Sequence, residues 1–522
     1  MKKYITILSF LLLFSCEDEF YKDVNKYLAI DTEEEKVEMM NGIYSNLVKV
    51  HNYNYFSLTG RADDLNQYIS YMFYLEDGRI NCGASASNQI DYTDIASEKY
   101  SFLYTAIINI NTLLETLKEP EDKYLLGELH FLRAYCYLKL ARLFGTPPLV
   151  KDTDVSYTLE KPTHQEMFQF IEEELLNAIE LLPETYTEAR VSGETPHKGT
   201  AKALLAEVYL SMAGFPLYDT GKYAEAARLA GEVIERADYY NFALLDDFAS
   251  LWKEDYKHNK ENLFGLFFKG NEDNEMNNIA NYMLSYNMEG EWASMNLESS
   301  YNPEIKFYVD FPLNYRKEQT FVIGTYGAKY YNTMDTSFYV MQFSPFDPIK
   351  EPCEFIRGAV YKKWIDITNE KYDPGNFAEK YSVYSALSEV TLYLLRYAHT
   401  LLTYAEAKAR SGNLDASAYE MINRIRRRAN HLDIYSPSVF DLTPGLSAEQ
   451  FADSVVKERS WELAGEPDGR WFDIIRLNLK DQLPSMSYSF DFPNKATSAS
   501  VTDEWYFYPI PEQDRFLNPN FK

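Results

Sequence analysis

Cysteine, histidine and basic residues are scarce in this chain of 522 residues, which has only four Cys and seven His. Cys82, Cys136 and Cys353 are too scattered for a disulfide framework, and Cys136 lies in an apolar helical stretch that suits core packing. No histidine has a second one at metal-ligand spacing, so we expect no metal site. The chain has 51 Lys and Arg but 79 Asp and Glu, which gives a net charge of −28. This charge argues against nucleic acid as a binding partner, because proteins bind nucleic acids through clustered basic side chains.

Recognisable catalytic motifs are also missing. The chain contains no Gly-x-Ser-x-Gly elbow, His-Glu-x-x-His zinc helix, phosphate-binding loop or dinucleotide glycine fingerprint. The acidic run Asn271–Glu275 lacks the spacing of a calcium loop. We therefore predict a noncatalytic protein without a cofactor. A surface glycosidase stays open as an alternative, because its carboxylate pair is set by space and not by sequence.

The one apolar run that stands out begins near the first residue. Ile5 to Phe14 follows two lysines and is too short to span a bilayer, which is the pattern of a secretory signal, and Ser15-Cys16 resembles the end of a lipobox. We predict a signal peptide over residues 1–15, a lipidated Cys16, a lipid-anchored polar tether over residues 16–31, and a water-soluble body over residues 32–522 outside the cytoplasm. Cleavage would remove two lysines and no acids, leaving a net charge of −30. The alternative is an ordinary cleavable signal with an incidental cysteine.

Helical periodicity is strong in four places, each a predicted pair of antiparallel helices around a Gly or Pro break. The pairs are Lys123–Phe144 with Thr163–Leu182, Gly199–Ala213 with Lys222–Arg236, Leu392–Ser411 with Ala416–Arg428, and Ala448–Gly465 with Arg470–Leu477. Thr163 and Glu166 have the spacing of a capping box. Alanines beside tyrosines recur in these helices and resemble tetratricopeptide-type repeats at irregular spacing. The predicted fold is mainly α, a degenerate tetratricopeptide-like scaffold at about 123–236 and 392–477.

Two stretches, at about 52–97 and 246–384, break this pattern. They are rich in Asn, Tyr, Gly and Pro and show few helical faces. Long irregular segments in compact proteins are usually functional. We therefore predict that these two insertions form a large irregular, loop-rich region and that this region carries the ligand-binding surface.

The stretch Lys457 to Arg476 resembles the signature of the RagB/SusD family of outer-membrane nutrient-binding lipoproteins. Further resemblances follow in family order at Leu132–Val150, at Leu395–Ala407 and in the tail, where Tyr508-Pro509-Ile510-Pro511 and Asn518-Pro519-Asn520 occur. The resemblance implies an SusD-like glycan-binding protein of the outer membrane whose partner is a SusC-like TonB-dependent transporter. The acids Glu17 to Glu19 after Cys16 resemble a signal for export to the cell surface; a solvated linker is the alternative.

The signature block contains Trp461, Glu466, Arg470, Trp471, Asp473 and Arg476. Its charged residues sit at helical spacings that favour structural ion pairs over catalysis. Glu458, Glu462 and Glu466 recur at four-residue intervals, so we expect them to pair with Arg470 or Arg476.

Binding a neutral glycan requires aromatic faces for the sugar rings and polar side chains for their hydroxyls. The chain has 44 Tyr, 32 Phe and 6 Trp, and both insertions combine such rings with polar groups. The candidate ligand-binding residues are Arg61, Asp63, Asp64, Asn66, Tyr68 and Tyr71 in the first insertion, and Asn287, Trp292 and Tyr301 in the second. A tyrosine stripe at helical spacing can instead be core. A peptide ligand, or a structural repeat adaptor without any small ligand, remain alternative functions.

Overall fold

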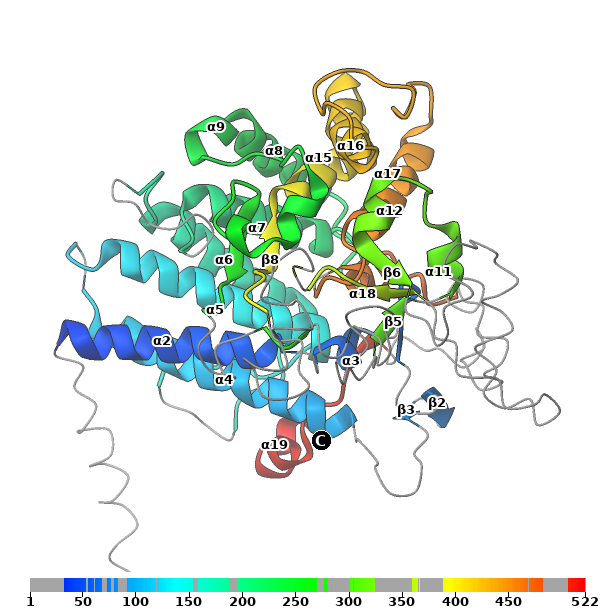
Figure 1. Ribbon diagram of the computed structural model, residues 1–522. Coiled ribbons are helices and arrows are strands. Elements are labelled where there is room, and N and C mark those ends of the chain that lie inside the picture. The colour runs from blue at the N-terminus through cyan, green and yellow to red at the C-terminus, as the bar shows by residue number, and fades with distance from the viewer. Residues whose placement is uncertain are drawn as a thin grey trace, which may run out of the picture.

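The fold is mainly α-helical in the computed structural model (Figure 1). The structure describes residues 32–52, 55–60, 62–67, 73–76, 79–82, 92–118, 120–153, 158–186, 195–269, 277–279, 283, 301–303, 305–323, 359–364, 366, 388–467, 469–481 and 506–521. The helices are α2 (Glu33–Val50), α3 (Tyr55–Thr59), α4 (Tyr92–Thr116), α5 (Lys123–Phe144), α6 (His164–Leu181), α7 (Lys198–Met212), α8 (Lys222–Glu235), α9 (Ala237–Tyr240), α11 (Ile305–Asp310), α12 (Tyr315–Thr320), α15 (Tyr397–Arg410), α16 (Ala416–Ala429), α17 (Ala448–Glu462), α18 (Arg470–Arg476) and α19 (Glu512–Leu517). The strands are β1 (Leu65–Gln67), β2 (Phe73–Glu76), β3 (Arg79–Cys82), β4 (Asn262–Leu266), β5 (Tyr301–Pro303), β6 (Phe321–Ile323), β7 (Ala359–Tyr361) and β8 (Leu392–Arg396).

The long helices stack in chain order. Helix α2 packs on α4, and contacts then continue from α4 to α5, α6, α7 and α8. After the long second insertion, α15 packs against both α7 and α8, and α16 and α17 pack against α15 (Figure 1). The predicted helix-pair scaffold is therefore confirmed, and its two halves form one continuous stack.

Several predicted helix boundaries agree with the structure to within one residue. Helix α5 has the predicted bounds, and the capping box of α6 is present: the Glu166 N–H donates to Thr163 Oγ1 at 3.1 Å, and the Thr163 N–H donates to Glu166 Oε2 at 2.7 Å. Two long helices, α2 and α4, were not predicted; α4 begins at Tyr92, so the last residues assigned to the first insertion are helical.

One predicted helix was wrong in its first part. Residues Leu392–Arg396 form strand β8, and the helix begins only at Tyr397. All five residues of β8 are buried, and such a short apolar run does not distinguish a strand from a helix by periodicity. The antiparallel partner of β8 is β4, with Asn262 opposite Arg396 and Leu266 opposite Leu392. The chain leaves the scaffold after β4 and re-enters it at β8, so this ladder closes the base of the second insertion.

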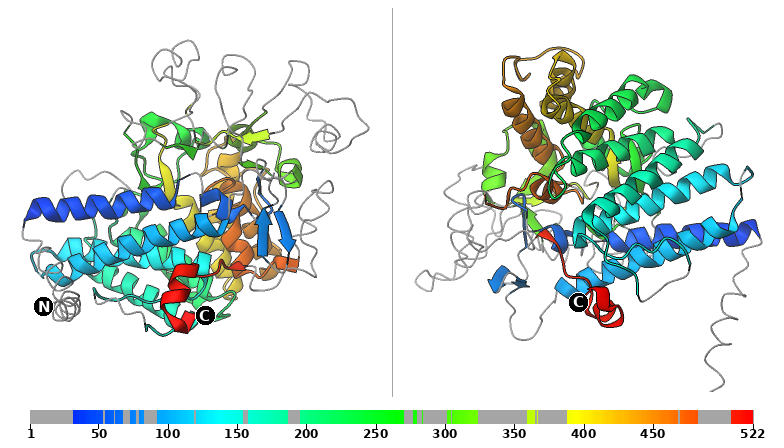
Figure 2. Two further views of the ribbon diagram at one scale, coloured as in Figure 1. Left: turned by 90° about the horizontal axis from the view of Figure 1, so that it is seen from below. Right: turned by 180° about the vertical axis from the view of Figure 1, so that it is seen from behind.

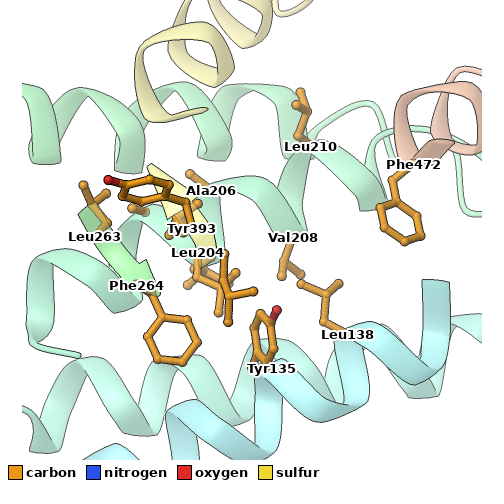
Figure 3. Packing of buried hydrophobic residues seen from close by; sticks show 14 of the residues in the cluster. Tyr135, Leu138, Leu204, Ala206, Val208, Leu210, Leu263, Phe264, Tyr393 and Phe472 are labelled. Atoms are coloured by element: carbon orange, nitrogen blue, oxygen red, sulfur yellow. The ribbon is translucent and has the colours of Figure 1, made fainter. Parts of the chain in front are cut away.

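The hydrophobic core extends through the helix stack, and one part of it lies where the β4–β8 ladder meets α5 and α7 (Figure 3). The ring of Phe264 on β4 makes edge contacts with Phe131 and Tyr135 of α5, with centroids 5.0 and 5.4 Å apart. Helix α5 is buried over most of its circumference, and Cys136 on it is completely buried, as the sequence predicted. A helix that is buried on nearly all sides is typical of a protein centre.

The C-terminal tail returns to the first repeats. The Tyr508 N–H donates to the Leu143 carbonyl at 2.7 Å, and the side chains of Asn518 and Asn520 donate to the Leu159 carbonyl at 3.0 and 3.2 Å. Helix α19 then lies beside α4 in both views (Figure 2). In the described ranges, no helix is both long and apolar enough to cross a membrane.

Candidate functional site

The two insertions meet through strands β1 and β5. These strands pair antiparallel, with Leu65 opposite Pro303, Asn66 opposite Asn302 and Gln67 opposite Tyr301. More than 200 residues separate the strands along the chain. Strand β5 also contacts β7, so segments of both insertions lie together, to the right of centre in Figure 1.

An ion pair holds the segment that leads into β1. Arg470 Nε donates to Asp63 Oδ1 at 2.6 Å, and Arg470 Nη2 donates to Asp63 Oδ2 at 3.1 Å. Both side chains are buried, with exposed fractions of 7% and 8%. A bidentate Arg–carboxylate pair fixes orientation as well as distance. Helix α18, which begins at Arg470, thus sets the position of the first insertion.

The next residue, Asp64, is anchored to two other elements. Its backbone carbonyl accepts a hydrogen bond of 2.7 Å from the Tyr361 hydroxyl on β7. Its carboxyl accepts from the Gly465 N–H in the turn between α17 and α18. Burial, and then the charge of Asp63, raise the pKa of the Asp64 carboxyl to about 7, against the opposing charge of Arg470. The entry to β1 is therefore fixed from β7 and from the signature segment at once.

A buried charge network lies under this segment and centres on α17. Glu462 accepts hydrogen bonds from Arg316, Arg396 and Arg428 at 2.9, 3.1 and 2.7 Å. These four side chains are at most 1% exposed. Burial alone would raise the pKa of Glu462, but the three guanidinium groups hold it well below its usual range.

Glu466 extends this network towards the insertions. Its carboxylate accepts from Arg396 Nη2 at 2.8 Å and from Lys363 Nζ at 2.9 Å. Lys363 follows β7 and is fully buried, and this burial lowers its pKa to about 8. Glu261 also joins the network through Arg396 and Arg428. Charges from α16, α17, β8 and the second insertion therefore neutralise one another inside the protein.

The other end of α18 is bound to the repeat scaffold. Arg476 donates from Nη1 and Nη2 to the two carboxylate oxygens of Glu406 on α15, both at 2.7 Å. Burial opposes ionisation of Glu406, yet Arg476 and Arg410 lower its pKa to about 2. Arg476 Nε also donates to Asp473 at 2.9 Å. Helix α18 therefore connects a scaffold helix at Arg476 with the strand pair of the insertions at Arg470.

Known proteins resemble this chain along most of its length. An SusD-like protein P2 from Formosa agariphila is 27% identical over 76% of this chain and 72% of its own length. The structure of a SusD homolog from Bacteroides thetaiotaomicron, 23% identical, has a TM-score of 0.72 and covers 96% of this chain and 98% of that one. A structure with a xylogluco-oligosaccharide, 20% identical, has a TM-score of 0.65, with 92% and 98% covered.

Two family models match the two parts of the chain. The model described as "SusD family" matches residues 302–522, and the model described as "Starch-binding associating with outer membrane" matches residues 20–210. The chain belongs to the SusD family. As a SusD-family protein, it is one of a group of starch- or glycan-binding proteins that associate with the outer membrane.

The structure brings some predicted ligand residues of this SusD-family chain together. Asn66 and Tyr301 lie on the paired strands β1 and β5, one register position apart. Asp63 and Asp64 are buried immediately before β1, and their contacts favour a role in holding that strand over direct ligand contact. The other candidates lie outside the described residues: Arg61, Tyr68, Tyr71, Asn287 and Trp292, together with Cys16.

The signature residues take structural contacts in this SusD-family fold. Trp471 is buried against Tyr506, with ring centroids 6.1 Å apart, and Lys457 Nζ lies 5.3 Å from the centroid of Trp461. The predicted pairing of Glu458, Glu462 and Glu466 with Arg470 or Arg476 was wrong. Those carboxylates bind side chains on α12, β8 and α16 and Lys363 after β7, whereas α18 begins after a turn and its Arg470 binds Asp63.

The ion-pair partners of the signature glutamates come from distant segments of the chain and were not predicted. Arg316, Arg396, Arg428 and Glu261 were not singled out, although all four are buried in the network. The one available signal was Arg396, a charge that ends the apolar run of β8, because a buried charge requires a partner. Among the described residues, no group of three or more His, Cys, Asp or Glu could hold a metal ion; the acidic run at 271–275 lies outside that description.

Proposed function

We propose that this chain is a noncatalytic glycan-binding lipoprotein of the cell surface that delivers oligo- or polysaccharides to a SusC-like TonB-dependent outer-membrane transporter. Cys16 is the proposed lipid anchor and residues 16–31 the tether. The β1–β5 ladder carries the proposal, because it joins the two insertions that combine aromatic and polar residues. The relative whose structure holds a xylogluco-oligosaccharide supports a glycan as the ligand.

The proposed binding surface comprises the β1–β5 pair and its flanking segments. Asn66 and Tyr301 would contribute from the strands, and Arg61, Tyr68, Tyr71, Asn287 and Trp292 from the flanks. Rings that pack on sugar faces and amides that bond hydroxyls are the chemistry such a site needs. The fixed anchors at Asp63 and Asp64 support a preformed surface, which lowers the entropic cost of binding.

Retention on native gels that contain starch, xyloglucan or other neutral glycans tests the ligand and the site. We expect the protein to be retarded by at least one glycan, and Trp292→Ala and Tyr301→Ala to reduce the retardation. Tyr435→Ala removes a tyrosine that is 63% exposed on the loop between α16 and α17, so it is the matched control. Equal retardation of all three variants would exclude the assigned surface.

The same preparations separate the competing functions. Release of shortened products from a bound glycan would show a surface glycosidase and contradict the noncatalytic assignment. Binding of peptides without any glycan would identify a peptide-binding member of the family. Absence of any small ligand would leave a structural repeat adaptor.

The membrane and transporter parts have their own test. Cys16→Ala is expected to shift the folded protein from the membrane to the soluble fraction, because the acyl chains supply the membrane affinity. The wild-type protein, extracted gently from outer membranes, is expected to copurify with a large β-barrel transporter. Purification of the wild-type protein alone under these conditions would count against the delivery role.

A further inference from the structure

A concave surface lies away from the β1–β5 pair. It is a groove of about 820 Å³ between α2, the turn Pro120–Asp122 with the start of α5, and the residues that end and follow β4. We call it the α2–α5 groove. Both helices begin at the left-hand edge of Figure 1, whereas β5 lies at the right. The volume falls within the range of small-molecule sites, about 300–1,000 Å³.

The groove is lined by aromatic rings and a methionine from three different segments. Tyr44 and Met40 come from α2, Tyr124 from α5 and Phe267 from the residue after β4. Tyr124 is 55% exposed, so its ring is available to a ligand at the rim. Phe267 stacks on His258 with centroids 4.9 Å apart, which fixes its ring. Exposed or fixed aromatic rings of this kind can pack on the apolar faces of sugar rings.

The polar groups of the groove are arranged in bonded sets. Lys36 Nζ donates to Glu33 Oε1 at 2.8 Å and to Asp122 Oδ1 at 3.0 Å. The Tyr44 hydroxyl donates to Glu128 Oε1 at 2.6 Å. Glu33 is largely exposed, but the partly buried Lys36 and Asp122 and the buried Glu128 present oriented donors and acceptors with little rotational freedom left to lose.

The charges of the groove exclude one class of ligand. Four acids line it, at positions 33, 121, 122 and 128, against Lys36 and Lys123. An anionic ligand would be repelled by the excess of acids. A neutral molecule with many hydroxyl groups matches both the oriented polar groups and the rings.

We infer that the α2–α5 groove is a second binding site for neutral oligosaccharides. This inference rests on the proposed function, because it assigns a further point of contact with the same class of ligand. When a polysaccharide long enough to reach both sites binds at the β1–β5 surface, its effective concentration at the groove rises. Binding at both sites therefore increases the overall affinity.

Methyl NMR on the full-length protein, with 13C-labelled methionine methyl groups, tests the groove directly. Met40 lines it, and Met40→Leu assigns its signal. The probes are maltoheptaose and a xylogluco-oligosaccharide. We expect a saturable shift of the Met40 signal, and Tyr124→Ala to weaken the affinity read at Met40 by about tenfold. Tyr239→Ala, which removes a ring that is 52% exposed on α9, is the control and should leave that affinity unchanged.

The outcomes separate this inference from the proposed function. If the probes bind and Trp292→Ala abolishes all binding while Met40 never shifts, the groove assignment falls and the proposed function stands. A Met40 shift that Tyr124→Ala does not weaken also overturns the groove assignment. If neither probe nor any glycan on the native gels binds, both proposals fall.

Discussion

Arg470 and Asp63 lie 407 positions apart in the chain and form a buried bidentate ion pair. Arg470 begins the signature helix, and Asp63 precedes the strand that joins the two insertions. The family signature therefore contacts the segment that leads into β1 through this ion pair and through the Gly465 N–H, while Arg476 at the other end of the same helix contacts the scaffold. The most recognisable motif of the chain is a connector between them.

The strength of this connection can be measured with a double-mutant cycle of Asp63→Asn and Arg470→Gln. Each single variant leaves a buried charge without its partner, which costs about 3–5 kcal/mol of unfolding free energy. We expect the double variant to lose less than the sum, with a coupling of at least about 1.5 kcal/mol from urea unfolding curves. Additive losses would mean that the two side chains do not stabilise each other.

The raised pKa of Asp64 predicts a pH dependence of folding stability that is opposite in sign to that of most carboxylates. Its pKa rises to about 7 on folding from an ordinary value of 3.8, so the folded state holds the proton more tightly than the unfolded state. Its contribution to stability is complete below pH 3.8 and is lost as the pH rises to 7, by up to about 1.4 kcal/mol per pH unit. Asp64→Asn removes this loss.

The stability difference between Asp64→Asn and the wild-type protein should therefore shift in favour of the variant from pH 5 to pH 8. Urea unfolding of both proteins at these two pH values gives that difference. A constant difference would show that Asp64 has an ordinary pKa in the folded protein.

His197 predicts the reverse slope. It caps α7, where the Gly199 N–H donates to its Nδ1 at 3.1 Å, and its ring stacks on Phe242 with centroids 4.9 Å apart. Burial lowers its pKa from 6.5 to about 4, so this contribution to stability is complete above pH 6.5 and is lost as the pH falls towards 4. His197→Asn keeps a cap acceptor without the titration. From pH 7 to pH 5 the unfolding free energy of the wild-type protein should therefore fall relative to that of His197→Asn. An unchanged difference between the two proteins would contradict a neutral His197 cap.

Two glycines with similar positive φ angles allow the cost of the left-handed backbone to be distinguished from the cost of crowding by neighbouring atoms. Gly465 has φ +69°, and an added Cβ would lie 2.6 Å from the Tyr361 ring, whereas Gly412 has φ +77° with nothing within 4 Å. Gly412→Ala should cost only the left-handed conformation, about 1–2 kcal/mol. Gly465→Ala should cost about 1–3 kcal/mol more by overpacking. Thermal unfolding of the pair measures the difference, and equal losses would mean that Tyr361 moves aside freely.

Glu462→Gln tests the buried network. Three arginines would lose a charged partner, so we expect a loss of about 3–5 kcal/mol in unfolding free energy. Glu449→Gln on the exposed first turn of α17 is the control, with an expected loss of about 0.3–1 kcal/mol. Similar effects of the two substitutions would contradict a stabilising role for Glu462.

The parts of the fold that could be predicted from sequence depend on local signals. Helices α5 and α6 follow from periodicity, a capping box and the Gly-Pro break between them. Strand β8 was mistaken for helix because an apolar run buried on all sides has no period to read. The partners of Glu462 and Arg470 could not be predicted, because ion pairs across hundreds of residues depend on how distant segments pack.

The candidate site was predictable only as a pair of regions. Composition separated the insertions from the repeats, but nothing in either insertion indicated that Leu65–Gln67 would pair with Tyr301–Pro303. Asp63 and Asp64 were predicted to bind ligand because polar residues surround them in the sequence. In the structure both are buried and make structural contacts instead.

The β1–β5 ladder also limits how this protein can be redesigned or can diverge. A loop grafted from a relative into one insertion brings its own strand length and register, and the partner strand in the other insertion must match both. Transplants of a single insertion should therefore often fail to fold locally, whereas exchange of both together keeps the ladder intact. If ligand is bound at the proposed surface, a change of ligand preference would then require both segments to change together.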